Sequence, residues 1–115
     1  MRGSRASKSV RGSRESKSVR GSRTGRPVMV LLDLLGRRWA LRVIWELREA
    51  RRLNFRDLLA ASETSPSVLN TRLAELRAAG IVAHGAAGYA LTETGADLLV
   101  RLLPLHEWAE HWAAR

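Results

Sequence analysis

One helix is marked more clearly than any other element of this sequence, over residues 65–80, "SPSVLNTRLAELRAAG". Ser65 is a good N-cap, Pro66 suits the first helical position, and Gly80 suits the C-terminal exit. Apolar residues recur at spacings of four and three, which places them on one narrow stripe of the helix. They are Leu69, Leu73 and Leu76. A single face of this helix is therefore predicted to pack against a core.

The opposite face of this helix is small and polar, without the Glu/Lys pairs of an ordinary solvated helix. It carries Ser67, Asn70, Thr71, Ala74 and Ala78. A shorter helix is predicted just before it over "NFRDLLAA" (54–61), with Asn54 as its cap and Asp57 in its first turn. Two short strands follow, "IVAH" (81–84) and "YALT" (89–92), around the tight turn "GAAG". This order indicates a winged helix-turn-helix, whose second helix lies in the major groove of DNA.

Two helices are predicted before this motif and one after it. "PVMVLLDLLG" (27–36) is an apolar run that Pro begins and Gly ends. "RRWALRVIWELREA" (37–50) has one apolar face, made by Ala40, Val43, Ile44 and Leu47. The last stretch is predicted to be a long helix with Thr92 near its start, and Pro104 should bend it or remove a backbone hydrogen bond. Its wide apolar surface comprises Leu98, Leu99, Leu102, Leu105, Trp108 and Trp112. The predicted fold class is mainly α with a small β-hairpin.

The N-terminal segment differs sharply from the rest of the chain. A nine-residue unit is written twice, with one letter changed, in "RGSRASKSVRGSRESKSV" (2–19). Residues 1–26 hold nine Lys or Arg and one acid, for a net charge of +8, whereas residues 27–115 carry +1. A segment so poor in apolar residues is predicted to be disordered, ahead of one folded domain over 27–115. It is either a cationic arm for DNA phosphates or a passenger that arose as a repeat in the coding DNA.

The residue types exclude several classes of function. The absence of cysteine removes disulfides, thiolate metal sites and thiol redox sensing. No apolar run reaches the roughly 18 residues of a membrane helix, and no apolar region follows the basic N-terminus as a secretory signal requires. No Ser/His/Asp set, phosphate loop or convergent carboxylate pair is present, so we expect neither an enzyme nor a cofactor. His106 and His111 lie about 140° apart around a helix, so no metal site is expected there.

Four motifs, in order, resemble the HxlR-type winged helix-turn-helix regulators, which are relatives of the MarR group. "PVMVLLDLLGRRW" is similar to that family's opening, and "LNFRDL" is similar to its Arg-Phe-x-Glu-Leu element. "TSPSVLNTRLAELRAAGIV" resembles its recognition helix, and "YALTETG" resembles its step into the last helix. The resemblance covers residues 26–112. It implies a bacterial, homodimeric, DNA-binding transcription regulator, expected in the cytoplasm with the nucleoid.

Two sets of residues receive roles from this resemblance and from the helix pattern. The first set is expected to contact double-stranded DNA: Asn54, Arg56, Ser65, Ser67, Asn70, Thr71, Arg72, Arg77 and His84. The second set is expected to pair the subunits through the first and last helices: Val28, Leu31, Leu32, Leu35, Leu102, Leu105, Trp108 and Trp112. Arg72 is equally suited to a phosphate contact and to an ion pair with Glu75. Two recognition helices one helical turn of DNA apart predict an inverted-repeat operator.

The sequence departs from the family pattern at three places. Arg26 stands where many members have a sensing Cys, so thiol sensing is not carried over. The hairpin is much shorter than the usual wing, and His84 is its only potentially basic residue. Thr64 replaces an apolar residue before the recognition helix. Positive charges available for phosphate contact in the domain are therefore few, and the candidates are Arg37, Arg38, Arg51, Arg52, Arg56, Arg72 and Arg77.

Three functions stay open at this point. The first is a sequence-specific regulator, most simply a repressor. The second is a nucleic-acid-coating protein in which the basic segment binds and the domain only dimerises. The third is a protein-interaction module that no longer binds DNA, which the nearly neutral domain allows. The sequence does not reveal whether a small-molecule effector binds, and the tryptophans are expected in core or dimer packing rather than in a ligand pocket.

Overall fold

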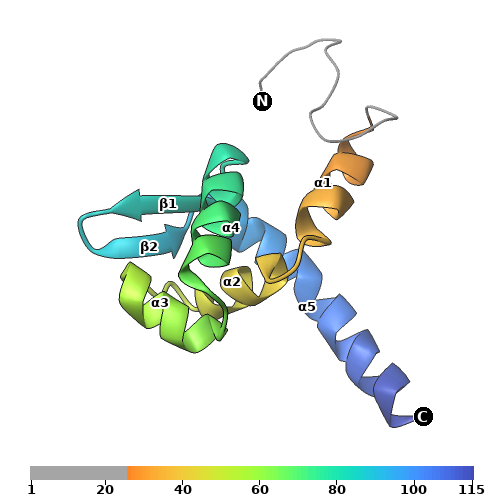
Figure 1. Cartoon of the computed structure of the whole chain (residues 1–115). Helices are drawn as coiled ribbons and strands as arrows, with labels where there is room; N and C mark the ends of the chain where they lie inside the picture. The colour runs from red at the N-terminus through yellow and green to blue at the C-terminus, as the bar shows by residue number, and fades with distance from the viewer. Residues whose placement is uncertain (1–25) are drawn as a thin grey trace. The chain divides into compact units, whose positions relative to one another are not determined.

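The computed structural model of the chain describes residues 26–115 (Figure 1). The predicted disordered segment, apart from Arg26, lies outside the described residues. Contacts divide the chain after Gly36. The N-terminal unit holds α1 (Pro27–Leu35). The second unit, Arg37–Arg115, holds α2 (Ala40–Glu46), α3 (Phe55–Ser62), α4 (Pro66–Ala78), β1 (Val82–Gly85), β2 (Gly88–Leu91) and α5 (Glu93–Ala114).

Helix α1 begins and ends where the sequence predicts. Pro27 occupies its first position after the extended Arg26 backbone, and the amide of Gly36 donates to the carbonyl oxygen of Leu32 at 2.8 Å. Proline suits this start because its missing N–H would have no partner inside the helix. The helix leaves much of its apolar surface open, with Val28 57% and Leu32 54% exposed.

Helix α2 lies at the centre of the second unit and packs against α3, α4 and α5. The predicted apolar face is confirmed, because Ala40, Val43, Ile44 and Leu47 are all buried. The helix itself is shorter than the predicted 37–50. Trp39, which precedes it, has a φ of 75°, and the residues Glu49 and Ala50 beyond its end also have positive φ. Residues in this left-handed region cannot continue a right-handed helix.

The two helices of the predicted DNA-binding motif are capped as expected. Asn54 Oδ1 accepts from the amide of Asp57 at 2.8 Å, and Ser65 Oγ accepts from the amide of Val68 at 3.2 Å. Each cap supplies a partner to an amide that has none inside its helix. The predicted stripe of α4 is buried at 0–2% exposure and consists of Leu69, Leu73 and Leu76.

Strands β1 and β2 form an antiparallel hairpin in which Gly85 pairs with Gly88, so that each strand reaches one residue further into the turn than predicted. Leu53 adds a bridge to this hairpin by exchanging two backbone hydrogen bonds with Tyr89, at 3.0 and 2.8 Å. Gly88 has a φ of 115°, and a Cβ there would lie 2.6 Å from the carbonyl oxygen of Leu53. Only glycine allows this close approach.

Helix α5 starts at the predicted cap and continues past its proline as one helix (Figure 1). Thr92 Oγ1 accepts from the amide of Gly95 at 3.0 Å. Pro104 has no N–H, so the carbonyl of Val100 lacks its donor within the helix. None of the helices over residues 26–115 is long and apolar enough to cross a membrane.

Candidate nucleic-acid interface

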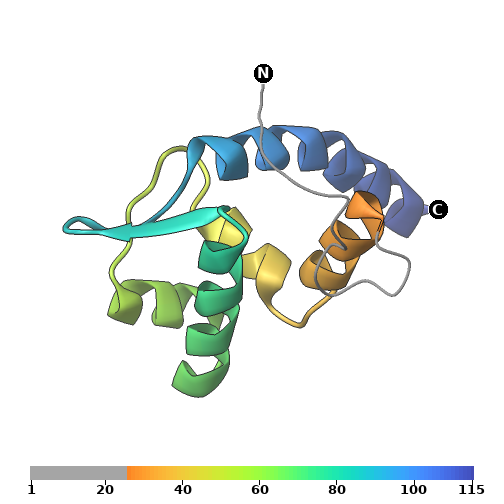
Figure 2. The same cartoon turned by 90° about the horizontal axis from the view of Figure 1, so that it is seen from above.

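Helices α3 and α4 form a helix-turn-helix and lie side by side in both views (Figures 1 and 2). The turn between them is short because Glu63 adopts a left-handed conformation with a φ of 58°. Its amide donates to the carbonyl oxygen of Leu59 at 3.1 Å and so closes α3. Ser65 then caps α4. This turn and the buried stripe of α4 leave the polar face of α4 in solvent.

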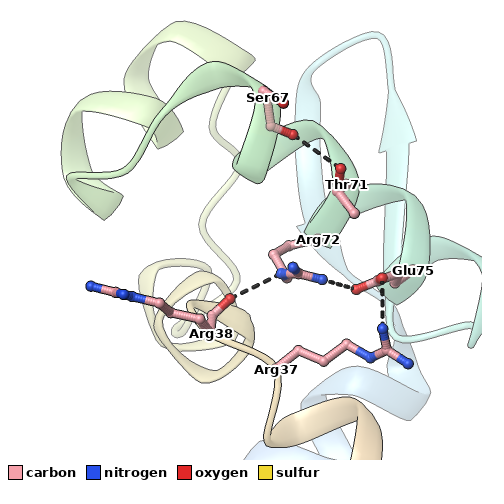
Figure 3. Close-up of polar contacts among 6 residues, drawn as sticks. All are labelled: Arg37, Arg38, Ser67, Thr71, Arg72 and Glu75. Carbon is pink, nitrogen blue, oxygen red and sulfur yellow. Dashed lines mark hydrogen bonds and ion pairs between the residues drawn. The ribbon is translucent and has the colours of Figure 1, made fainter.

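Every residue of the predicted outer face of α4 is exposed, and these residues are Ser67, Asn70, Thr71, Ala74 and Ala78. Thr71 Oγ1 donates to the carbonyl oxygen of Ser67 at 3.1 Å, which leaves its lone pairs as acceptors (Figure 3). The side-chain amide of Asn70 makes no hydrogen bond within residues 26–115, so its donors and its acceptor are available together. That pair of groups is what bidentate contact with an adenine edge requires.

Two further predicted DNA contacts, Asn54 and Ser65, are exposed at the starts of α3 and α4. Their side-chain oxygens are occupied by capping, since each accepts from an amide of its own helix. The amide NH₂ of Asn54 and the hydroxyl proton of Ser65 remain as donors. Both residues can therefore cap a helix and donate to a phosphate oxygen at once.

The structure sorts the seven candidate arginines into two groups. Three of them make ion pairs: Arg37 and Arg72 with Glu75, and Arg51 with Glu46 at 3.9 Å. The other four are exposed and make no ion pair in the described part of the chain: Arg38, Arg52, Arg56 and Arg77. The guanidinium of Arg38 lies over the ring of Trp39, 5.3 Å from its centroid. These four cations are the ones available to phosphates without breaking an internal pair.

Arg72 differs from the other predicted DNA contacts in two ways. It is half-buried whereas they are exposed, and its guanidinium is engaged within the protein. Nη1 lies 2.5 Å from Glu75 Oε1, and Nε donates to the carbonyl oxygen of Arg38 at 2.9 Å (Figure 3). Of the two alternatives that the sequence left open, the ion pair with Glu75 is present in the structure. A phosphate contact by Arg72 stays a prediction.

The hairpin offers little positive charge, because β1 and β2 contain neither Lys nor Arg. The exposed imidazole of His84 stacks on Tyr89 across the hairpin, with ring centroids 3.9 Å apart and planes 3° apart. The cross-strand register brings the two rings together, since His84 and Tyr89 are paired residues. The groups that this hairpin offers to DNA are therefore one imidazole and the hairpin backbone.

The residues predicted to pair two subunits are open to different degrees. On α5, Leu105, Trp108 and Trp112 are 59%, 60% and 52% exposed, and the two indoles stack at 6.0 Å. Leu102 and, on α1, Leu31 are half-buried, Val28 and Leu32 are exposed, and Leu35 is buried.

The sequence did not reveal the cleft of about 310 Å³ between α2 and α5. Its walls are mostly apolar, and the ring of His106 stacks on Trp45 there with centroids 5.6 Å apart. Leu41 and Leu103 line it and are 47% and 42% exposed. Periodicity alone could not show this cleft, because it depends on how two helices far apart in sequence cross.

Comparison with known proteins agrees with this geometry. The sequence model of the HxlR-like helix-turn-helix family matches residues 34–115. The quinone-bound form of YodB from B. subtilis is similar, with a TM-score of 0.67 and 29% identity over 75% of this chain and 98% of YodB. A protein described as a MarR-family transcriptional regulator, from Enterococcus faecalis V583, shares the fold, with a TM-score of 0.66 and 23% identity over 86% of this chain and 96% of its own. No curated protein matches the chain.

Proposed function

Since the chain belongs to the HxlR-like helix-turn-helix family of DNA-binding regulators, which are not enzymes, we propose that it represses transcription as a homodimer on an inverted-repeat operator. The observation that carries this proposal is the outer face of α4. It presents uncharged polar side chains, Asn70 among them, on a helix whose opposite face is fixed in the core. Side chains that read bases need to be polar, exposed and held on a rigid element.

The apolar surface of α5 supports a dimer. Trp108 and Trp112 are more than half exposed, and large aromatic side chains at such positions are typical of protein interfaces. Residues 37–115 form a small unit, for which burial against a second copy adds apolar area. Two copies related by a two-fold axis would present two α4 helices about one DNA turn, or about 34 Å, apart. The half-sites would then form an inverted repeat.

Repression is the simplest sign of regulation for such a protein. A dimer that occupies two adjacent major grooves excludes polymerase from the same DNA by occupancy alone. Activation would require, in addition, a surface that contacts polymerase. The four unpaired arginines, Arg38, Arg52, Arg56 and Arg77, would supply phosphate contacts that fix the dimer on the duplex.

Selection from a pool of randomised 30-base-pair duplexes with the full chain tests this proposal. We expect enrichment of one inverted repeat with half-site centres about 10 base pairs apart. The enriched duplex should bind at least about 1,000-fold more tightly than a scrambled duplex of the same composition. A pool that shows no enriched motif, although the protein binds it, would contradict the proposal.

The coating function has a specific observation in its favour, since most of the net charge of +9 lies in residues 1–26. A version of the chain that starts at Arg26 separates the two functions when both proteins are titrated with salt. If the shortened protein keeps its preference for the selected duplex, α4 reads sequence and the basic segment adds only salt-dependent affinity. If it loses all DNA binding, the basic segment is the binding element and the domain serves dimerisation or protein interaction.

A further inference from the structure

A cluster of charged side chains joins the flank of α4 to the segment that leads into α2 (Figure 3). The two carboxylate oxygens of Glu75 each face one guanidinium: Oε1 lies 2.5 Å from Arg72 Nη1, and Oε2 lies 3.3 Å from Arg37 Nη1. Arg72 Nε donates to the main-chain carbonyl oxygen of Arg38 at 2.9 Å. Two side chains of α4 therefore reach residues more than thirty positions earlier in the chain. We refer to these four residues as the α4 clamp.

Partial burial distinguishes the Arg72–Glu75 pair of the α4 clamp from an ordinary surface ion pair. The side chains of Arg72 and Glu75 are 17% and 26% exposed, whereas the surface pair Arg101–Asp97 on α5 is 72% and 63% exposed. Arg37, which pairs with Glu75 from the outside, is 48% exposed. Ion pairs that are partly withdrawn from water are screened less and hold their geometry better than exposed ones. The planar guanidinium of Arg72 also meets a carboxylate and a carbonyl at once, which the single ammonium of lysine matches poorly.

The segment on the other side of the clamp is itself well defined. The amide of Ala40 donates to the carbonyl oxygen of Arg37 at 3.0 Å, and the amide of Val43 donates to that of Trp39 at 3.0 Å. Trp39 is fixed in a left-handed conformation with a φ of 75°. The carbonyl oxygen of Arg38 thus belongs to a hydrogen-bonded turn at the start of α2. It is therefore an acceptor with a well-defined position for Arg72 Nε.

The clamp lies on the same helical turns as the outer face of α4. Arg72 directly follows Thr71, and Glu75 lies one turn later, about 40° around the helix from Thr71. A rotation or slide of α4 that breaks the clamp would therefore displace Asn70 and Thr71 as well. Hydrogen bonds to base edges require a placement accurate to about 0.5 Å.

We propose that Arg72 and Glu75 are positioning residues that clamp α4 onto the start of α2, and that this clamp sets sequence discrimination while Arg72 makes no phosphate contact. The inference deepens the proposed operator binding and rests on it. Nε and Nη1 of Arg72 are both engaged inside the protein, so substitution of Arg72 disturbs the placement of α4 and leaves the neutralised phosphates unchanged. This arrangement also explains an acidic residue next to the surface proposed to face DNA, since Glu75 forms ion pairs with both Arg37 and Arg72.

Four variants of the full chain test the proposal: R72Q, R72K, E75Q and the control D97N. Affinity is measured on the selected duplex and on its scrambled counterpart over a range of salt. We expect R72Q and E75Q each to lower the ratio of the two affinities about tenfold, as the loss of one charge-assisted hydrogen bond implies, although they change the net charge in opposite directions. D97N changes the charge as E75Q does and should leave the ratio unchanged. R72K should resemble R72Q, and the salt slope of R72Q should equal that of the original protein.

Two results of the binding measurements would overturn the clamp. In the first, R72Q reduces the salt slope by about 0.9 for each phosphate that it leaves without a cation and R72K restores the slope, which identifies Arg72 as a phosphate ligand. In the second, E75Q keeps the original affinity ratio. Hydrogen exchange of the free protein tests the clamp separately: R72Q and E75Q should speed exchange of the α4 amides about tenfold and D97N should not. If the original protein prefers no duplex, the proposed function fails, and unchanged exchange would overturn the clamp independently.

Discussion

Helices α4 and α5 begin alike and then differ in what they cover. A hydroxyl caps each of them, Ser65 for α4 and Thr92 for α5. The leucine stripe of α4 is buried at 0–2% exposure, and its outer face is small and polar. On α5 only Gly95 is buried, and five large apolar side chains are exposed: Val100, Leu103, Leu105, Trp108 and Trp112.

This difference separates two kinds of recognition within one small unit. The apolar face of α4 is buried within its own unit, so its remaining, polar surface suits a polar partner such as the edges of bases. Large apolar side chains of α5 are not covered by the described residues, so its surface suits contact with a second apolar surface. In both views its C-terminal half extends beyond the rest of the second unit (Figures 1 and 2).

The largest effect is expected from truncating a leucine on each helix. Leu69 on α4 is fully buried and Leu105 on α5 is 59% exposed. Leu69→Ala should lower the free energy of unfolding by about 3 to 4 kcal/mol, through lost burial and a cavity. Leu105→Ala should cost less, and its cost should depend on protein concentration, because it acts through the dimer. Urea unfolding at two protein concentrations measures both, and equal, concentration-independent losses would remove the distinction between the helices.

The second prediction addresses the α5 surface directly. Trp108→Asp should weaken the dimer by about 2 to 3 kcal/mol, since a buried tryptophan is a common hot spot and the new carboxylate loses its water. Val100→Asp is the matched control: Val100 is 63% exposed on the same helix but lies about 80° around it from Trp108, which is 60% exposed. Sedimentation equilibrium gives the dissociation constants. Equal weakening by both variants would mean that the interface is not centred on Trp108.

Features set by neighbours in sequence could be predicted from the sequence, as the caps show. Asn54, Ser65 and Thr92 were expected at helix starts, and each accepts a hydrogen bond from an amide three residues later. The leucine stripe of α4 follows from the helical repeat in the same way. Local signals thus defined the helix-turn-helix and the outer face of α4.

Features that depend on distant segments could not be predicted. Helix α2 begins later than predicted because Trp39 adopts a left-handed conformation, and Glu49 and Ala50, beyond its end at Glu46, are left-handed as well; none of these residue types carries a local signal for that conformation. The bridge between Leu53 and Tyr89 joins two segments that α3 and α4 separate in the sequence. The hydrogen bond from Arg72 Nε to the carbonyl oxygen of Arg38 joins residues 34 positions apart, which no local pattern could indicate.

Base reading by α4 should produce the third effect in size. Asn70→Ala is expected to reduce the preference for the selected duplex about tenfold, or about 1.4 kcal/mol, by removing a bidentate donor and acceptor. Thr71→Ala should reduce it less, because the Thr71 hydroxyl already donates to Ser67. Thr94→Ala, an exposed threonine in the first turn of α5, serves as the control and should change nothing. Fluorescence anisotropy on selected and scrambled duplexes measures each ratio; an unchanged ratio for Asn70→Ala would place sequence reading elsewhere.

The smallest effect should come from a single arginine on each helix. Arg77 of α4 is exposed without an ion pair in the described part of the chain, whereas Arg101 of α5 pairs with Asp97 at 3.2 Å. Arg77→Gln should reduce the slope of log affinity against log salt by about 0.9 for each phosphate that Arg77 neutralises, equally on selected and scrambled DNA. Arg101→Gln removes the same charge and should leave the slope unchanged. If both variants change the slope equally, net charge rather than position governs the phosphate contacts. The arginines of α4 and α5 would then contribute equally to binding of the DNA backbone.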